Sequence, residues 1–212
     1  PNRSGWKAIE CDLEIIKCEH LSRNMLFSDT GLPWVLPSPN MPTLDTALVY
    51  PGGCLFEATN ISEGRGTTKP FEILGAPYID GNDWITETLS VLRMWSLDLK
   101  DLGLSLREIQ FEPQFHKHAK TRCGGVQVHI DSPRSCKSYA LGLALIVAAA
   151  KIYPRHFAWR EKPYEFIENV PAIDLLYGSN DFRRIVEANS YHTINCGTAS
   201  LTTDYYHNLL YS

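Results

Sequence analysis

Residues 139–153 read Y-A-L-G-L-A-L-I-V-A-A-A-K-I-Y, and Pro154 follows them directly. The stretch is apolar on every side, which is typical of a helix buried on most of its surface, and proline cannot continue such a helix. The longest apolar run, residues 140–150, is about half of the roughly 20 residues that a bilayer-spanning helix needs. The pattern therefore predicts a core helix, and we expect no transmembrane segment.

Two further helices are predicted. One lies upstream, where apolar residues recur in steps of three and four; Asp83 can cap its start, and Gly103 stands where a C-terminal cap belongs. The other is short and covers residues 182–188, with Asn180 or Asp181 at its start. The apolar face of the upstream helix consists of Ile85, Leu89, Leu92, Trp95, Leu99 and Leu102.

Short β-rich segments alternate with these helices. Strands are predicted for residues 13–19, 55–60, 106–112 and 126–130, the last of them after a turn at Gly124 and Gly125. Because strands and helices interleave, the fold class is α/β, with α+β possible, and we expect a mixed sheet with flanking helices.

Prolines mark residues 31–53 as a different kind of segment. The segment holds five of the 13 prolines, and each fixes its own φ and restricts the residue before it. We therefore predict an extended, packed loop here, which cannot be a regular helix.

Composition excludes several classes of function. The 212 residues hold 20 Lys+Arg against 24 Asp+Glu, a formal net charge of -4, whereas a protein that grips phosphate backbones needs a concentrated basic surface. We expect no nucleic-acid partner. The sequence begins at Pro1 and shows no basic segment followed by an apolar stretch, so no signal peptide is expected within it.

Metal and cofactor signals are weak. The six cysteines form no C-x-x-C pair, and the tract His116-Lys117-His118 near Cys123 has a lysine that repels a cation and no carboxylate at ligand spacing. We expect a solvated loop there and no metal. Neither a Walker A nor a G-x-G-x-x-G motif is present, so no cofactor is expected.

The strongest candidate site is the loop at residues 60–68 (N-I-S-E-G-R-G-T-T). Arg65 offers a planar fork of donors for a carboxylate or phosphate, and the glycines beside it allow a ligand to approach the backbone. Glu63 could act as an acid, a base or an acceptor for sugar hydroxyls. Alternatively, Arg65 pairs with Glu63 or Glu57 and braces the loop. Near a polar loop, the aromatic rings of Tyr78 and Trp34 are candidates for stacking on a sugar.

Longer motifs resemble one family, the exo-β-N-acetylmuramidases of bacterial cell-wall recycling, long catalogued as a domain of unknown function. The resemblance extends over most of residues 13–212. Its motifs are residues 30–35 (T-G-L-P-W-V), 37–43 (P-S-P-N-M-P-T), 50–52 (Y-P-G), 60–72 (N-I-S-E-G-R-G-T-T-K-P-F-E), 75–77 (G-A-P), 111–113 (F-E-P), 123–126 (C-G-G-V) and 209–211 (L-L-Y).

The resemblance implies a two-part architecture. Family members pair an N-terminal Rossmann-like domain with a C-terminal α/β portion, and the sugar site lies in the cleft between them. Residues 1–30 are then the residual end of the N-terminal domain, and residues 31–212 form the C-terminal α/β domain. A complete site calls for an N-terminal domain or a partner chain besides these residues. The family's exported members suggest a periplasmic or extracellular location, which this sequence leaves open.

The implied activity is the release of terminal N-acetylmuramic acid from a muramic-acid-containing glycan or muropeptide. Glu63 is the catalytic candidate, and the guanidinium of Arg65 would bind the lactyl carboxylate of muramic acid. The further substrate-binding candidates are Asn40, Asn60, Ser62, Thr67 and Tyr78.

One part of the family's site has no counterpart in this sequence. The family's proposed catalytic glutamate lies in a Pro-Glu-His-Gly segment, whereas the only Glu-His pair here, Glu19-His20, precedes Leu21. Glycoside hydrolysis ordinarily needs two carboxyl groups, about 5–5.5 Å or about 6.5–9.5 Å apart, and Glu63 supplies one. The alternative is a non-catalytic relative that serves as a structural or sugar-binding subunit of a larger assembly.

Overall fold

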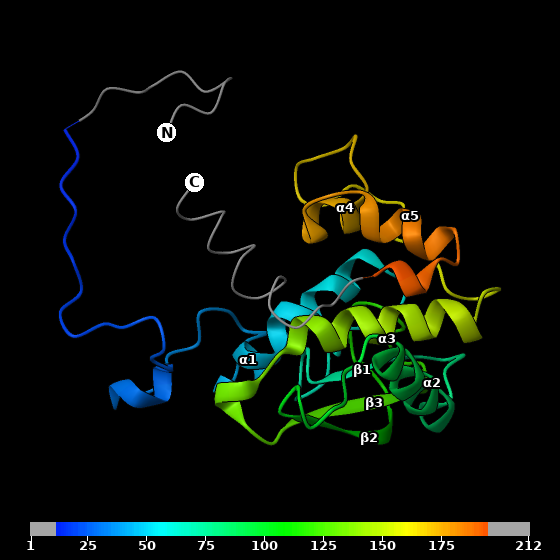
Figure 1. Ribbon diagram of the computed structural model, residues 1–212, viewed down its shortest axis with the longest axis horizontal. Coiled ribbons are helices and arrows are strands. Elements are labelled where there is room, and N and C mark those ends of the chain that lie inside the picture. The colour runs from blue at the N-terminus through cyan, green and yellow to red at the C-terminus, as the bar shows by residue number, and fades with distance from the viewer. Residues whose placement is uncertain (1–11, 195–212) are drawn as a thin grey trace. The chain divides into compact units, whose positions relative to one another are not determined.

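The computed structural model describes residues 12–194, so the motif at residues 209–211 lies outside the described residues. Two units are distinguished along the chain, and Trp34 is the first residue of the larger one, Trp34–Cys196. Figure 1 shows the helices and strands of this larger unit.

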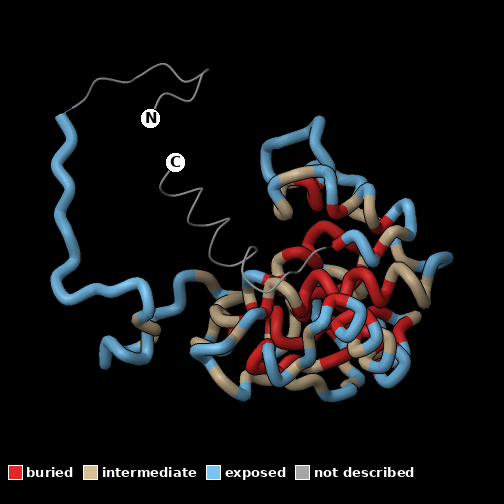
Figure 2. Tube along the Cα trace, in the orientation of Figure 1, coloured by how far each residue is buried: buried red, intermediate tan, exposed pale blue. Residues whose placement is uncertain are grey.

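The segment before Trp34 contains no strand among its described residues, so the strand predicted at residues 13–19 is wrong for the described structure. Ile16 is 88% exposed, and Figure 2 shows the segment exposed along nearly its whole length. A strand needs a neighbour for its backbone N–H and C=O groups, and no hydrogen-bonded neighbour is described here. The segment contains the 3₁₀ helix η1 (Phe27–Thr30), closed by Gly31 at a φ of 68°.

Helix α1 (Leu44–Gly53) corrects the prediction of an extended loop over residues 31–53. Thr43 caps it, because its hydroxyl accepts a hydrogen bond from the backbone N–H of Thr46 at 3.2 Å. Four of the five prolines precede this cap. Only Pro51 lies inside the helix, in the last turn, where little helix remains to be disturbed.

The strand predicted at residues 55–60 is also wrong. The chain forms the 3₁₀ helix η2 (Cys54–Ala58) instead. Leu55, Phe56 and Ala58 are all fully buried, so the segment has no exposed face to alternate with a buried one, as a half-buried strand would.

A three-stranded sheet lies under the helices. Its strands are β1 (Ile73–Ala76), β2 (Leu104–Phe111) and β3 (Cys123–Ile130), in the order β1-β3-β2. The predicted strands at residues 106–112 and 126–130 are confirmed as β2 and β3. Both pairings are antiparallel, so the described sheet is antiparallel rather than mixed.

The expected Gly124-Gly125 turn is part of strand β3. A Cβ on Gly125 would lie 2.0 Å from the carbonyl oxygen of Leu74 on the neighbouring strand. Gly125 therefore allows close approach of β1, and Gly124 allows close approach of the carbonyl oxygen of Ile79 at 2.1 Å. Close packing of backbone is a second use of glycine that a sequence pattern does not distinguish from a turn.

Helix α2 (Gly81–Met94) confirms the upstream helix but moves both of its ends. Asp80 rather than Asp83 is the cap, with its carboxylate accepting from the backbone N–H of Asp83 at 3.0 Å. The helix stops before residue 102 because Ser96 adopts a left-handed φ of 58°. Trp95 and Leu102 are nevertheless buried, so the predicted apolar face extends into the turns that follow.

Helix α3 (Ser138–Ile152) confirms the predicted buried helix. It packs against α1 and α2, and the indole N–H of Trp84 on α2 donates to the carbonyl of Leu145 at 2.9 Å. Figure 1 shows α3 between the sheet and the C-terminal helices α4 (Ala172–Tyr177) and α5 (Asp181–Glu187). The last of these confirms the predicted short helix. The remaining 3₁₀ helices are η3 (Pro133–Ser135) and η4 (Tyr191–Thr193).

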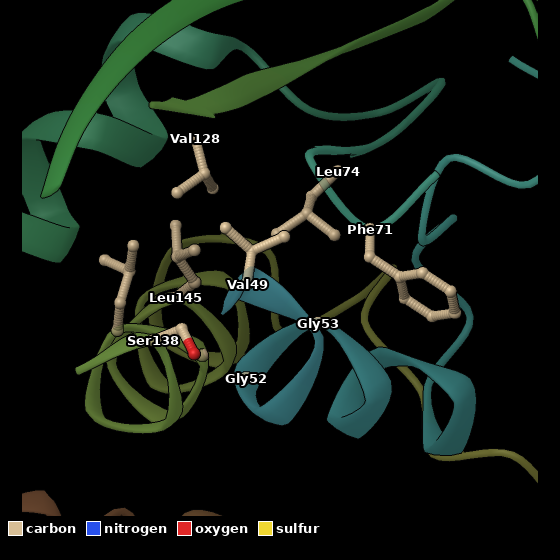
Figure 3. A pocket seen from close by; sticks show the side chains of 10 residues that line it. Val49, Gly52, Gly53, Phe71, Leu74, Val128, Ser138 and Leu145 are labelled. Carbon is tan, nitrogen blue, oxygen red and sulfur yellow. The ribbon is translucent and has the colours of Figure 1, made fainter. Parts of the chain in front are cut away.

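The α/β class is confirmed by these helices over a sheet. Between α1, α3 and the sheet lies an apolar cavity of about 10 Å³, room for about one water molecule, with Val49, Leu74 and Leu145 in its wall (Figure 3). It is too small for a sugar, so the candidate site lies elsewhere. Among the described residues, no helix combines the length and the apolar character that crossing a membrane requires.

Candidate functional site

The polar loop at residues 60–68 is the meeting point of three other segments. Ser62 pairs with Gly75 of β1, through backbone hydrogen bonds of 2.8 and 3.0 Å. The backbone N–H of Asn60 donates to the carbonyl of Ala158, and that of Gln114 donates to the carbonyl of Gly66, both at 2.9 Å. The loop is thus fixed by the polypeptide after β2 and by the polypeptide after α3.

The two glycines of the loop make room for protein rather than for a ligand. Gly64 and Gly66 have φ values of 76° and 86°, which side-chain-bearing residues rarely adopt. A Cβ on Gly64 would lie 2.4 Å from the carbonyl oxygen of Ile73, and one on Gly66 would lie 2.6 Å from that of Phe115. The expected approach of a ligand to the backbone at these glycines is therefore corrected to close packing of the main chain.

Arg65 lies between two carboxylates. Its Nη2 donates to Oε1 of Glu57 at 2.7 Å, and its Nε lies 3.1 Å from Oε1 of Glu63. The guanidinium carbon is 5.2 Å from the centre of the Phe71 ring, a cation–π contact. Burial opposes its charge, but the hydrogen bond and charge of Glu57 and the charge of Glu63 raise the pKa of Arg65. Both bracing ion pairs considered from the sequence are present, and the side chain remains 27% exposed.

Glu63 is completely buried and lies among basic side chains. Its Oε2 accepts a hydrogen bond from Nζ of Lys117 at 2.8 Å, and its Oε1 lies 3.2 Å from Nδ1 of His116. Burial alone would raise the pKa of Glu63, but His116 and Lys117 hold it at about 2. Glu63 is therefore an anion at any physiological pH, and the described geometry gives it no proton to donate.

The loop that delivers Lys117 is strained. His116, His118 and Lys120 all have left-handed φ values, of 72°, 56° and 57°, and Phe71 beneath Arg65 has one of 63°. Each such residue costs about 1–3 kcal/mol and persists only where the surroundings fix it. Their concentration around one charge network is typical of a functional site.

Asn60 and Tyr78 contact each other. The hydroxyl of Tyr78 donates to Oδ1 of Asn60 at 2.9 Å, and the amide of Asn60 donates to the carbonyl of His156 at 2.7 Å. The Tyr78 ring also packs against Tyr153 and His156. Burial raises the pKa of Tyr78, so its hydroxyl stays protonated. Both polar groups are thus engaged within the protein, and their predicted role toward a sugar stays a prediction.

Four more predicted residues have hydrogen-bond partners close to them in the sequence. Ser62 is buried, and its hydroxyl accepts from the N–H of Gly64 at 3.1 Å. Thr67 donates its hydroxyl to the carbonyl of Gly64 at 2.7 Å. In the described part of the chain, no hydrogen bond or ion pair joins Asn40 to this loop, and its N–H donates to the hydroxyl of Ser38. The indole N–H of Trp34 donates to the carbonyl of Met41.

Tyr164 extends the network on the side of Glu57. Its hydroxyl donates to Oε2 of Glu57 at 2.8 Å, and the guanidinium of Arg160 lies 5.6 Å from its ring centre. Burial and the neighbouring Glu57 raise the pKa of Tyr164, which keeps its proton on the hydroxyl. The loop after residue 160 is therefore attached to the same group of charges as Arg65.

Lys117 and Tyr164 carry no direct signal in the sequence. The tract His116-Lys117-His118 was open to a metal or a solvated-loop interpretation, and the structure instead buries the lysine against Glu63. Among residues 12–194 no three His, Cys, Asp or Glu side chains gather in a way that could hold a metal ion. The usable signal was indirect: a glutamate in a buried loop needs cations, and a lysine between two histidines is one source.

Comparison with known proteins matches two successive parts of the chain. The family description "Exo-beta-N-acetylmuramidase NamZ, N-terminal" matches residues 2–45, and "Exo-beta-N-acetylmuramidase NamZ, C-terminal" matches residues 48–203. The chain belongs to the NamZ family of exo-β-N-acetylmuramidases. A NamZ relative, the peptidoglycan beta-N-acetylmuramidase NamZ of Bacillus subtilis (strain 168), is 41% identical over 180 residues, which cover 85% of this chain and 40% of that protein.

The fold has a solved counterpart. A DUF1343 family protein from Bacteroides fragilis NCTC 9343 superposes with a TM-score of 0.64 at 22% sequence identity, over 79% of this chain and 41% of that one. At this identity the likeness concerns the fold alone. In both comparisons the chain spans about two fifths of the length of the protein it matches. The two NamZ matches meet between residues 45 and 48, and the division of the chain at residues 30 and 31 stays a prediction.

Proposed function

We propose that this chain is the substrate-recognising C-terminal portion of an exo-β-N-acetylmuramidase, which releases terminal N-acetylmuramic acid from peptidoglycan fragments. Its division into residues 1–30, the end of an N-terminal Rossmann-like domain, and residues 31–212 is part of the same proposal. Membership of the NamZ family supports this substrate class. The observation that carries the proposal is Arg65, whose side chain is partly exposed and whose guanidinium is fixed in orientation from two sides.

Arg65 is suited to the group that distinguishes muramic acid from glucosamine, the lactyl carboxylate. Nε and one N–H of Nη2 face Glu63 and Glu57, and the guanidinium has further N–H groups for a ligand. A planar fork recognises a carboxylate by two parallel hydrogen bonds, and a fork that is already fixed loses less entropy on binding. In this proposal Arg65 contacts the ligand, while Asn60, Ser62 and Thr67 shape the loop that presents it. Tyr78 and Asn40 stay candidates for the edge of the site.

Catalysis calls for carboxyl groups beyond Glu63. Because Glu63 is enclosed and ionised, its proposed role is narrowed to holding Arg65 as a fixed anion. Protonation of the leaving group then falls to a carboxyl supplied by the rest of a complete NamZ protein.

The burial and ionisation of Glu63 also favour the second candidate function, in which the chain binds muramic acid without hydrolysing it. The seven site residues predicted from the sequence include one carboxylate, and this one is buried.

The test is hydrolysis of 4-nitrophenyl β-N-acetylmuramide by this chain, alone and mixed with the N-terminal NamZ domain of the Bacillus subtilis relative. The glucosaminide of the same leaving group is the control substrate. We expect release from the muramide in the mixture and a loss of about 10- to 100-fold in Arg65→Ala, with little change for the glucosaminide. Equal losses for both substrates would contradict carboxylate recognition. No hydrolysis, together with calorimetric binding of N-acetylmuramic acid, would leave the non-catalytic function.

A further inference from the structure

Lys117 is the most enclosed cation of the charge network. Its Nζ donates to three acceptors: the carbonyl of Phe56 at 2.7 Å, the carbonyl of Ile61 at 3.1 Å and Oε2 of Glu63 at 2.8 Å. Three acceptors use all three N–H bonds of an ammonium group. Lys117 therefore has no N–H left for a ligand, and it can affect ligand binding only through these partners.

The backbone on both sides of Lys117 is strained. His116 before it and His118 after it both have left-handed φ values. The ring of His118 makes a 2.7 Å hydrogen bond to the carbonyl oxygen of Asn60, which anchors the tract to the site loop. Two strained residues that flank one inward-pointing lysine indicate that its position is specified by its surroundings.

Lys117 determines the net charge of the network. Among the acidic, lysine and arginine side chains, Glu57 and Glu63 contribute two negative charges, and Lys117 and Arg65 contribute two positive ones. The ring of His116, 3.2 Å from Glu63, is the same in every variant compared below. Without Lys117, a single guanidinium would face two carboxylates in a partly buried setting, where such interactions are stronger than in water. An anionic ligand would then meet a net negative site.

We propose that Lys117 is a positioning residue that neutralises the buried carboxylate of Glu63, so that Arg65 is held in place and still attracts an anionic sugar. This inference rests on the proposed function, since the ligand is the carboxylate of N-acetylmuramic acid. It adds a residue that contacts no ligand and acts only through Glu63 and Arg65.

The experiment is a charge series measured by calorimetric binding of N-acetylmuramic acid to the full chain, with N-acetylglucosamine as the uncharged control. Lys117→Met makes the network net negative, Glu63→Gln makes it net positive, and the double variant Glu63→Gln/Lys117→Met is neutral like the wild type. We expect the affinity for N-acetylmuramic acid to change by about tenfold for each unit of charge, in the order Glu63→Gln, wild type, Lys117→Met. The double variant, neutral like the wild type, should bind N-acetylmuramic acid more tightly than Lys117→Met and keep its preference over N-acetylglucosamine, which should bind all four alike.

A purely structural role for Lys117 predicts a different result. The hydrogen bonds to Phe56 and Ile61 are lost in both Lys117→Met and the double variant, so a structural role would weaken the two equally. That outcome would overturn the proposal. Circular dichroism shows whether each variant folds. If a single variant does not fold, the double variant is compared with the wild type alone. A double variant that folds but loses the preference for muramic acid would contradict charge neutralisation.

A second readout does not depend on the sugar. The charged groups that face Glu63 are Arg65 on its own loop and His116 and Lys117 on the neighbouring loop, with Glu57 beyond Arg65. In a ¹³C NMR titration, the Glu63 carboxyl should titrate at clearly higher pH in Lys117→Met than in the wild type. An unchanged titration would overturn the role of Lys117. A shifted titration without binding of N-acetylmuramic acid would instead overturn the proposed function.

Discussion

Gly52 of α1 and Gly142 of α3 face each other without any side chain between the two helices. A Cβ on Gly142 would lie 2.5 Å from the carbonyl oxygen of Gly52, and a Cβ on Gly52 would lie 1.9 Å from that of Ser138. Ser138 also donates its hydroxyl to the carbonyl of Leu48 on α1 at 2.7 Å. The contact places α1, and with it the start of η2 and the Glu57 side of the site, against the central helix (Figure 3).

Gly142→Ala should destabilise the protein by at least about 2 kcal/mol. Backbone atoms are the obstacle, so the helices must separate rather than a side chain rotate. Urea unfolding measures the effect. Helix propensity alone predicts the opposite sign, a gain of about 1 kcal/mol for alanine over glycine. A gain in stability would therefore show that the helices do not approach as described.

Gly66→Ala tests the packing of the site loop. The new Cβ would lie 2.6 Å from the carbonyl oxygen of Phe115, at a φ of 86°. We expect a loss of about 3 kcal/mol or more in the free energy of unfolding, from a clash added to a strained φ.

Gly31→Ala is the matched control for this variant. Gly31 also has a positive φ, of 68°, but in the described part of the chain no atom beyond its two neighbours in sequence lies within 4 Å of an added Cβ. Gly31→Ala should therefore lower the free energy of unfolding by no more than about 1–2 kcal/mol, the cost of the φ strain itself. Equal effects of the two substitutions on thermal unfolding would mean that the backbone of Phe115 does not close over the loop.

The core was predictable from the sequence because its signals are local. The apolar residues 139–153 and the strand patterns of β2 and β3 needed no knowledge of their partners. The proline content of residues 31–53 predicts no helix, yet α1 forms because only Pro51 lies after the cap. The strand at residues 13–19 has a strand's composition but no described neighbour, and pairing is not a property of the segment alone.

For the site, the sequence located the loop but not the role of each side chain. Polar density identified residues 60–68, and Arg65 is partly exposed there. It could not show that Glu63 is enclosed, because the enclosing cation, Lys117, is 54 positions away in a tract without a charge pattern of its own. Long-range ion pairs decide which carboxylate can act as an acid, and the spacing of residues along the sequence does not reveal such pairs.

Glu63→Gln should change the pH dependence of stability. Glu63 has a pKa of about 2 in the folded protein, below its ordinary value of 4.5. Between these values the unfolded chain binds a proton that the folded chain does not, so its contribution to stability rises with pH from about 2 to 4.5 and stays constant above. The variant lacks this rise and leaves Lys117 unpaired, at a cost of about 3–5 kcal/mol near pH 7.

Urea unfolding at pH 2.5, 4 and 7 measures this difference. The gap in stability between wild type and Glu63→Gln should be widest at pH 7 and narrow toward pH 2.5. A gap that is constant with pH would mean that Glu63 has an ordinary pKa in the folded protein. Glu187→Gln is a suitable control, because Glu187 is exposed and pairs with Arg183 at 3.3 Å on the surface of α5, where such pairs contribute little.

Tyr164→Phe should loosen the loop that follows residue 160. The hydroxyl of Tyr164 is bound to Glu57, and a hydrogen bond to a charged group is worth about 1.5–3 kcal/mol, so its loss should make local opening at least about tenfold more frequent. Trypsin cleavage after Arg160 reports this opening, and its time course can be followed by mass spectrometry. Phe166→Ala is the control, because Phe166 is 96% exposed in the same loop and should leave the cleavage rate unchanged. Equal rates for Tyr164→Phe and wild type would show that Glu57 does not hold the loop, and that the charge network ends at Arg65.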